Sequence, residues 1–237
     1  MDLELKQQQF NLAMERYERN RFYKIFGKCI AFSNVTLQIF LLLALLPFSI
    51  GWPRQIIALL LAFLVTDFIN GLVHLYMDHN DSYETWAGPL IANFHLHHRT
   101  PKYQDHNLLA VYFVETGSKI WLVFYLGLVA CLSPLFPPNS VLLFTLVYIG
   151  VLSSVAEVSH YLCHNSRSPV VDFLARLRIL LSKKQHSLHH REDNISYTFL
   201  NGLTDPLVNI IARKYFTGYK NGTDLHFAKY RGGQARE

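Results

Sequence analysis

Four long apolar stretches dominate the chain, and each is nearly free of formal charge. They cover residues 29–50, 55–73, 120–136 and 140–160. A helix that spans a bilayer needs roughly 20 apolar residues and tolerates about 17. The pattern therefore predicts an all-α, polytopic membrane protein with about four transmembrane helices.

Two further segments alternate apolar and basic positions with a helical period. Residues 169–182 interleave Arg176 and Arg178 with aliphatic side chains, and residues 206–215 begin with Pro206, which is favoured in the first helical turn. Both are predicted to be amphipathic helices at the membrane interface. We therefore expect an N-terminal segment over residues 1–28, one domain over 29–217 and a polar tail over 218–237.

Composition agrees with a membrane class. Hydrophobic residues make up 51% of the chain and charged residues 16%, which is unusual for a soluble domain. The net charge of +5 comes without any nucleic-acid-binding motif, so an anionic lipid surface is the simpler partner. The cysteines are isolated and are interpreted as packing residues: Cys29, Cys131 and Cys163. The mixed charges of residues 1–28 do not form a cleavable signal peptide.

Basic residues predict the orientation of these spans. Six Lys and Arg precede the first span, three lie between the second and third, and twelve follow the fourth; the two short connections hold one and none. By the positive-inside tendency, both termini and the long central connection face the cytoplasm. This assignment requires an even number of spans, and the sequence does not identify which membrane holds them.

Eleven of the twelve histidines fall into four clusters, each at or just after the end of an apolar stretch. Only His226 stands apart, and it is interpreted as an interfacial polar residue. Under the predicted orientation all four clusters lie on one side of the membrane. The clusters are His74 with His79; His95, His97, His98 and His106; His160 with His164; and His186, His189 and His190.

The spacings within the clusters suit metal binding. His160 and His164 are four apart and share a helical face, as do His74 and Asp78. His186, His189 and His190 form an H-x-x-H-H pattern, which also shares one face. About nine candidate nitrogens exceed what one tetrahedral ion accepts, so two metals are implied, and a histidine-rich pair favours iron for oxygen chemistry. The H-E-x-x-H motif of zinc proteases is absent.

The sequence leaves the roles of four polar residues undecided. His79 and His95 could be ligands or bystanders. Asp78 could orient a ligand, cap a helix or bind the metal directly. Asp67, inside the second apolar stretch, is either a buried polar contact or part of a path through the membrane, since an intramembrane carboxylate usually has a role.

These blocks together resemble the plasmanylethanolamine desaturase family, also called the Kua or CarF lipid desaturases, over residues 70–211. Residues 71–78 (GLVHLYMD) resemble its G-x-V-H-x-x-x-D block, and His97, His98 and Pro101 its H-H-x-x-P block, with His106 following. His160 to His164 and His186 to His190 resemble its last two boxes, and residues 202–206 a short later motif. The family often has an acidic residue before its paired histidines, where this chain has Leu96.

The resemblance implies a membrane lipid desaturase that uses a histidine-ligated di-iron centre and O2 on an alkyl or acyl chain of a phospholipid, with a vinyl ether as one product. Asp78 is expected to orient a ligand, and the headgroup to lie near Arg99, Lys102, Lys183 and Lys184. Electrons must come from an external carrier of the cytochrome b5 or ferredoxin type, because the chain holds no flavin or Fe–S motif. The expected ligands are His74, His97, His98, His106, His160, His164, His186, His189 and His190.

Two alternatives use the same residues. A di-iron lipid hydroxylase needs the same ligands, and sequence does not separate it from a desaturase. A membrane metal transporter or metal-binding sensor belongs to another class, but it should place polar residues at successive depths, whereas here they crowd one end of the spans. The lipid, the bond position and the oligomeric state stay open.

Overall fold

The computed structural model describes residues 3–99, 107–192 and 194–216. Within these ranges the chain is helical and contains no strand, which confirms the predicted fold class. The helices are α1 Leu3–Arg19, α2 Arg21–Leu45, α3 Trp52–His79, α4 Gly88–Arg99, α5 Leu108–Glu115, α6 Ile120–Leu132, α7 Val141–Asn165, α8 Pro169–Arg176, α9 Lys183–His189 and α10 Asp205–Tyr215, with short 3-10 turns η1 Thr116–Ser118 and η2 Ser133–Leu135.

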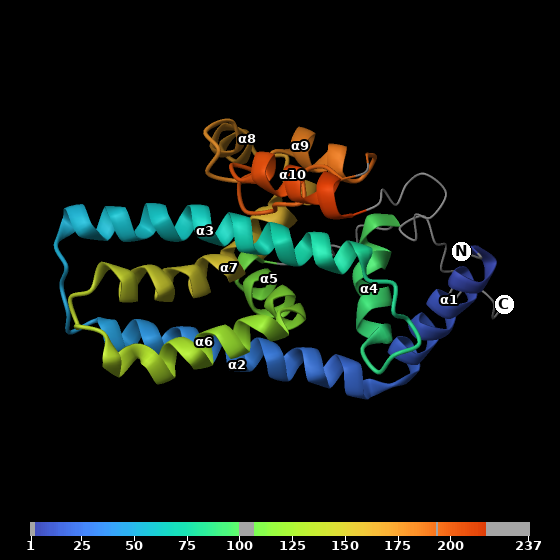
Figure 1. Ribbon diagram of the computed structural model, residues 1–237, viewed down its shortest axis with the longest axis horizontal. Coiled ribbons are helices and arrows are strands. Elements are labelled where there is room, and N and C mark those ends of the chain that lie inside the picture. Colours follow the sequence, from blue (N-terminus) through green and yellow to red (C-terminus); the bar gives the residue numbers. More distant parts are fainter. Residues whose placement is uncertain (1–2, 100–106, 193, 217–237) are drawn as a thin grey trace.

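A bundle of α2, α3, α6 and α7 forms the body of the molecule (Figure 1). Its apolar core includes Leu41, Leu122, Leu126 and Phe144. Large apolar side chains also cover its outside, such as Phe124, which is 72% exposed, and this is the surface expected to face lipid. Helices α2, α3 and α7 are each long and apolar enough to cross a membrane.

The two short connections of the bundle lie at one end, whereas α4 and α1 lie at the other (Figure 1). Helices α3 and α7 pack along each other and run in the same direction, so their C-terminal turns both point away from the short connections. Helices α8, α9 and α10 pack over the middle of the bundle beside α3. This arrangement brings the ends of α3 and α7 together with α4 and α9.

The third predicted span, residues 120–136, is one arm of a bent pair of helices. The segments Leu108–Ser118 and Ile120–Leu135 meet at 92°, so the described residues contain three candidate spans, or four when the bent pair counts as one. Helix α6 itself has 13 residues, about 20 Å, which is shorter than a bilayer core of roughly 30 Å. Asn34 of α2 stabilises the break, because its side-chain amide donates to the carbonyls of Thr116 and Lys119.

Helices α2, α3 and α7 each extend past at least one end of the apolar stretch that predicted them. Helix α2 begins at Arg21, eight residues before the expected start, since the Asn20 side chain caps its first turn by accepting from the Phe22 amide. Helix α3 continues to His79 and α7 to Asn165. The polar turns that carry His74, Asp78 and His164 are therefore parts of rigid helices and not of loops.

The N-terminal segment also contributes to the domain. Helix α1 buries Phe10, Ala13 and Met14 against α4 and the turn before it, where Tyr83 and Leu96 complete the cluster. Leu96, which replaces the family's frequent acidic residue, thus packs against α1. Helix α1 thus supports α4, the helix that carries His97 and His98.

The two amphipathic segments form helices, although the first is shorter than predicted. Helix α8 ends at Arg176, and Arg178 follows with a left-handed φ of 59°. Pro206 lies in the first turn of α10, as expected. The predicted tail over 218–237 lies outside the described residues.

Candidate metal centre

Four helices bring the histidine clusters to one place. The C-terminal turns of α3 and α7 approach α4 and α9, so that residues more than 100 positions apart lie in contact. The converging side chains separate into two groups whose potential ligand atoms all lie within 4.8 Å of one another. We call them the four-histidine group, with His97, His164, His186 and His190, and the Asp78 group, with His74, Asp78, His98 and His189.

The four-histidine group is centred on the Nε2 atom of His186. This atom lies 2.9 Å from Nε2 of His164 and 2.8 Å from Nε2 of His190. His160 adjoins the group, since its Nε2 is 2.9 Å from that of His186 and 3.2 Å from that of His164. Ring nitrogens that bind one ion at about 2.1 Å lie roughly 3 Å apart, so these spacings suit shared ligation.

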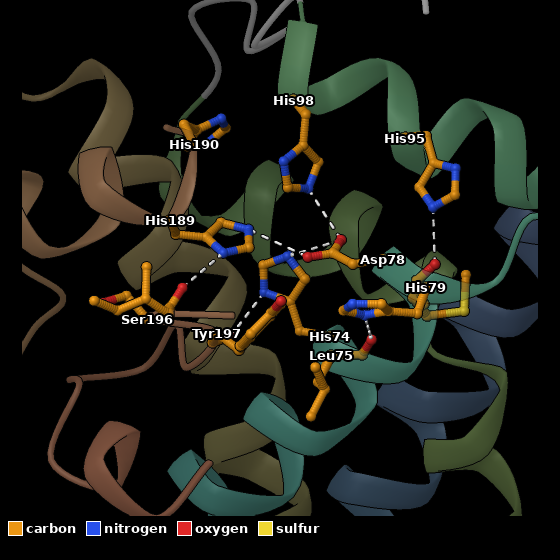
Figure 2. Close-up of polar contacts among 12 residues, drawn as sticks. His74, Leu75, Asp78, His79, His95, His98, His189, His190, Ser196 and Tyr197 are labelled. Carbon is orange, nitrogen blue, oxygen red and sulfur yellow. Dashed lines mark hydrogen bonds and ion pairs between the residues drawn. The ribbon is translucent and has the colours of Figure 1, made fainter. Parts of the chain in front are cut away.

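The Asp78 group surrounds a fully buried carboxylate (Figure 2). Oδ1 of Asp78 lies 3.1 Å from Nε2 of His98 and 3.5 Å from Nε2 of His74, and Oδ2 lies 3.4 Å from Nε2 of His189. Three imidazoles thus direct the same ring nitrogen toward one carboxylate. A mixed nitrogen and oxygen donor set of this kind suits a divalent transition ion.

Two pairs of consecutive histidines link the groups. His97 belongs to the four-histidine group and His98 to the Asp78 group, and His190 and His189 divide in the same way. Consecutive residues near a helix end project about 100° apart, so each pair reaches two different centres. The ring centroids of His98 and His190, one from each group, are 5.0 Å apart. The two groups are therefore adjacent, and the consecutive histidine pairs lie between them.

Backbone carbonyls orient two of the rings in the Asp78 group. Nδ1 of His74 is 2.8 Å from the carbonyl oxygen of Tyr197, and Nδ1 of His189 is 3.2 Å from that of Ile195 (Figure 2). A carbonyl only accepts, so each Nδ1 carries the proton and each Nε2 has its lone pair directed at the centre. The ring N–H groups of these two histidines are therefore held by the carbonyls of Ile195 and Tyr197, which belong to the segment 195–204.

Asp67 holds that segment against α3. Its buried carboxylate accepts hydrogen bonds from the amides of Asn201, Gly202 and Thr204 and from the Thr204 hydroxyl, at 2.7–3.3 Å. Asp67 is therefore a buried polar contact, one of the two possibilities that the sequence left open. Gly71, one turn further along, allows the close approach, because a Cβ there would lie 2.6 Å from Cγ2 of Thr198.

Burial keeps two of the ligand candidates outside the spans, His97 and His186, neutral. The pKa of His97 and that of His186 lie well below the usual value for histidine, first because burial penalises the charged ring and then because the neighbouring imidazoles repel a proton. Neutral imidazole is the form that binds metal. These rings are therefore in the ligating form at neutral pH.

The remaining predicted residues lie outside the two groups. His95 is fixed within the protein, since Nε2 is 2.8 Å from the Met77 carbonyl and Nδ1 is 2.6 Å from the Tyr83 hydroxyl. His79 bonds through Nδ1 to the Leu75 carbonyl and packs on Phe216. His106, an expected ligand, and His226 lie outside the described residues.

Comparison with known protein families decides the class of this chain. Residues 63–214 match the lipid desaturase domain, and every member of both groups lies within that range. The chain belongs to the lipid desaturase domain family. The match confirms the resemblance seen in the histidine blocks, and it leaves α1 and α2 outside the matched range. No curated protein and no solved structure matches the chain significantly.

Sequence reasoning missed the part played by residues 195–204. The segment contains none of the histidine motifs, yet its carbonyls orient His74 and His189 and its Phe199 ring packs against His74 and His160, with centroids 5.5 and 5.6 Å apart. The signals present in the sequence were the carboxylate of Asp67 inside an apolar stretch and Gly71 four residues later.

Proposed function

We propose that the protein is an O2-dependent lipid desaturase whose two histidine-rich groups each hold one iron ion. The observation that carries the proposal is the division of the consecutive pairs His97–His98 and His189–His190 between two adjacent donor groups within a lipid desaturase domain. A single metal ion would not need both histidines of each pair as ligands. A single structural zinc site would be complete with four ligands.

The donor set fits iron. Imidazole nitrogens with one carboxylate suit iron, and thiolates, which favour zinc or Fe–S clusters, are absent from both groups. We propose the histidines of both groups together with His160 and His106 as ligands, and Asp78 as a ligand of the second ion. The bound irons supply the oxidising power that breaks unactivated C–H bonds, which no side chain can do.

In the proposed reaction, two hydrogens leave adjacent carbons of a lipid chain and a double bond forms. Dioxygen takes up these two hydrogens, two further electrons and two protons, and two waters result. A separate electron carrier of the cytochrome b5 or ferredoxin type supplies the electrons. The chain's residues position the rings and keep bulk water out, since His74 is enclosed by Phe94, Tyr197 and Phe199.

For the substrate we propose the alkyl or acyl chain of a membrane phospholipid, with a plasmanylethanolamine-type ether lipid and a vinyl ether product as the first candidates. The lipid would enter from the bilayer between the spans. We also propose that both termini and the metal centre face the cytoplasm, because Lys and Arg are concentrated before the first span, between the second and third spans and after the fourth, and the two short connections hold only one.

The test combines metal analysis with lipid mass spectrometry. Purified full-length protein should contain about two irons per chain, and cells that express it should gain a phospholipid lighter by two hydrogens. His189→Ala and His190→Ala should each lower the iron content and abolish the product. His79→Gln is the matched control, because His79 is next to Asp78 but belongs to neither group. This variant should keep both the iron content and the lipid product.

The outcomes separate the alternatives. A product heavier by one oxygen would show that the protein is a hydroxylase with the same metal centre and not a desaturase. Full lipid oxidation in both alanine variants would refute the ligand assignment. Metal uptake without any oxidised lipid would favour a transporter or sensor.

A further inference from the structure

A pocket outside the metal centre lies between the end of α7, α8 and the start of α9. Its volume is about 210 Å³, and Cys163, Leu181 and Ala175 provide its apolar lining. Cys163 directly precedes His164, and Lys184, which also lines the pocket, lies two residues before His186. The pocket is therefore adjacent to the four-histidine group without containing any of its members.

Positive charge predominates around this pocket. Arg176, Lys183 and Lys184 line it, and Asp172 is the one carboxylate among its lining residues. The Lys183 ammonium donates to the Ser166 carbonyl and lies 3.6 Å from Asp172, so this cation already has partners. Among the described residues, the side chains of Arg176 and Lys184 have no hydrogen-bond or ion-pair partner, so two cations remain available to an anion.

The surroundings of the pocket are those of a lipid interface. Helix α8, which forms one wall, exposes Val170 and Phe173 to 63% and 57%, and Leu177 directly after it is 54% exposed. An amphipathic helix with such a face lies at the boundary of headgroups and acyl chains. A ligand in the pocket would thus have its charge at headgroup depth and its apolar part beside α8 and α7.

We propose that this pocket binds the phosphate of the glycerophospholipid whose chain reaches the metal centre. The proposal rests on the function proposed above and adds a residue-level site to it. Guanidinium and ammonium groups bind phosphate through charge-assisted hydrogen bonds, and the net positive lining favours a lipid with a phosphate over one without it. Anchoring the phosphate beside His164 would set which carbons of the chain reach the irons.

Native mass spectrometry of the full-length protein in a neutral detergent tests the site, because one spectrum reports bound lipid and bound metal. The probes are dihexanoyl phosphatidylethanolamine, dihexanoylglycerol, which lacks the phosphate, and inorganic phosphate. The variant is Arg176→Glu with Lys184→Glu. Arg213→Glu is the matched control, since Arg213 is an exposed cation on α10 that does not line the pocket.

We expect the phospholipid to bind and the other two probes to bind at least about tenfold more weakly. The double variant should lose about tenfold or more of the phospholipid affinity with an unchanged metal content, and Arg213→Glu should match the parent protein. Unchanged phospholipid binding in the double variant, or equal binding of dihexanoylglycerol, would overturn the proposal. Displacement of the lipid by an equal concentration of inorganic phosphate would instead indicate a free-anion site. Lipid binding in a protein without iron would refute the proposed function and leave this site standing.

Discussion

At the scale of single residues, the orientation of the candidate ligands depends on groups that bind no metal. Asp67 makes its hydrogen bonds two helical turns before His74, yet it secures the segment whose carbonyls orient His74 and His189. A buried carboxylate that accepts several hydrogen bonds is costly to alter, because its partners lose their acceptor inside the protein.

Replacing Asp67 with Asn should weaken this anchor. The amide side chain keeps one acceptor oxygen, but its NH2 group would face the backbone N–H groups that the carboxylate accepts from. We therefore expect a loss of about 2 kcal/mol of stability and a lower iron content. Thermal unfolding and metal analysis measure the two effects. Glu15→Gln is the control, since Glu15 is an exposed acid in a surface pair with Arg19 at 3.6 Å. Full stability and full iron in Asp67→Asn would show that other contacts hold the segment.

Gly71 offers a second test of the same segment. In Gly71→Ala the new methyl group would collide with Cγ2 of Thr198, which should cost about 1–3 kcal/mol and shift the carbonyl that orients His74. Adding Thr198→Ser removes that methyl group and should restore much of the stability and the metal content. Gly127→Ala is the control, because nothing lies within 4 Å of the Cβ position there. A lack of rescue by Thr198→Ser would contradict the collision as the cause.

At the scale of elements, the break between α5 and α6 depends on buried polar contacts. Lys119 lies at the bend, where its ammonium is 3.0 Å from Oε1 of Glu157 and 2.7 Å from Oδ1 of Asn70. The same ammonium lies 4.7 Å above the centre of the Phe199 ring. An ion pair this deep in a membrane bundle is tolerated only when both charges have partners.

We expect Lys119→Met to destabilise the protein by about 3–5 kcal/mol, because Glu157 would remain buried without its counter-charge. Glu157→Gln should cost less, since Lys119 keeps Asn70 and the Ser153 carbonyl as partners. The double variant should be more stable than Lys119→Met alone. Denaturant unfolding in detergent gives the three values, and additive effects would mean that the pair does not act as a unit.

The sequence predicted most of the helices, but not the bend between two of them. Apolar length predicted α2, α3 and α7 as spans, and the four-residue spacing of His160 and His164 predicted a shared face. Apolar length started the third predicted span at Ile120 and did not reveal that α5 joins it at a 92° bend, because the break is stabilised by Asn34 and Glu157 from other helices.

At the scale of the whole molecule, the arrangement of the helices predicts that the metal centre and the short connections lie on opposite sides of the membrane. In a background without Cys29, Cys131 and Cys163, single cysteines at Ser49 and Ser187 report the two sides. Ser49 belongs to the exposed connection between α2 and α3, and Ser187 is exposed on α9. A membrane-impermeant maleimide should label only Ser49→Cys in intact cells and both after lysis. Labelling of both in intact cells would refute the proposed orientation.

By itself, the sequence determined the membrane class, the principal spans, the four histidine blocks and the resemblance to the family, since each depends on residues close together in the chain. Only the tertiary structure decided how His97 and His98, or His189 and His190, divide between two centres, and which carbonyls orient His74 and His189. Helical periodicity defines the face of a single helix. The partner of that face depends on packing between helices more than 100 residues apart, which no local pattern encodes.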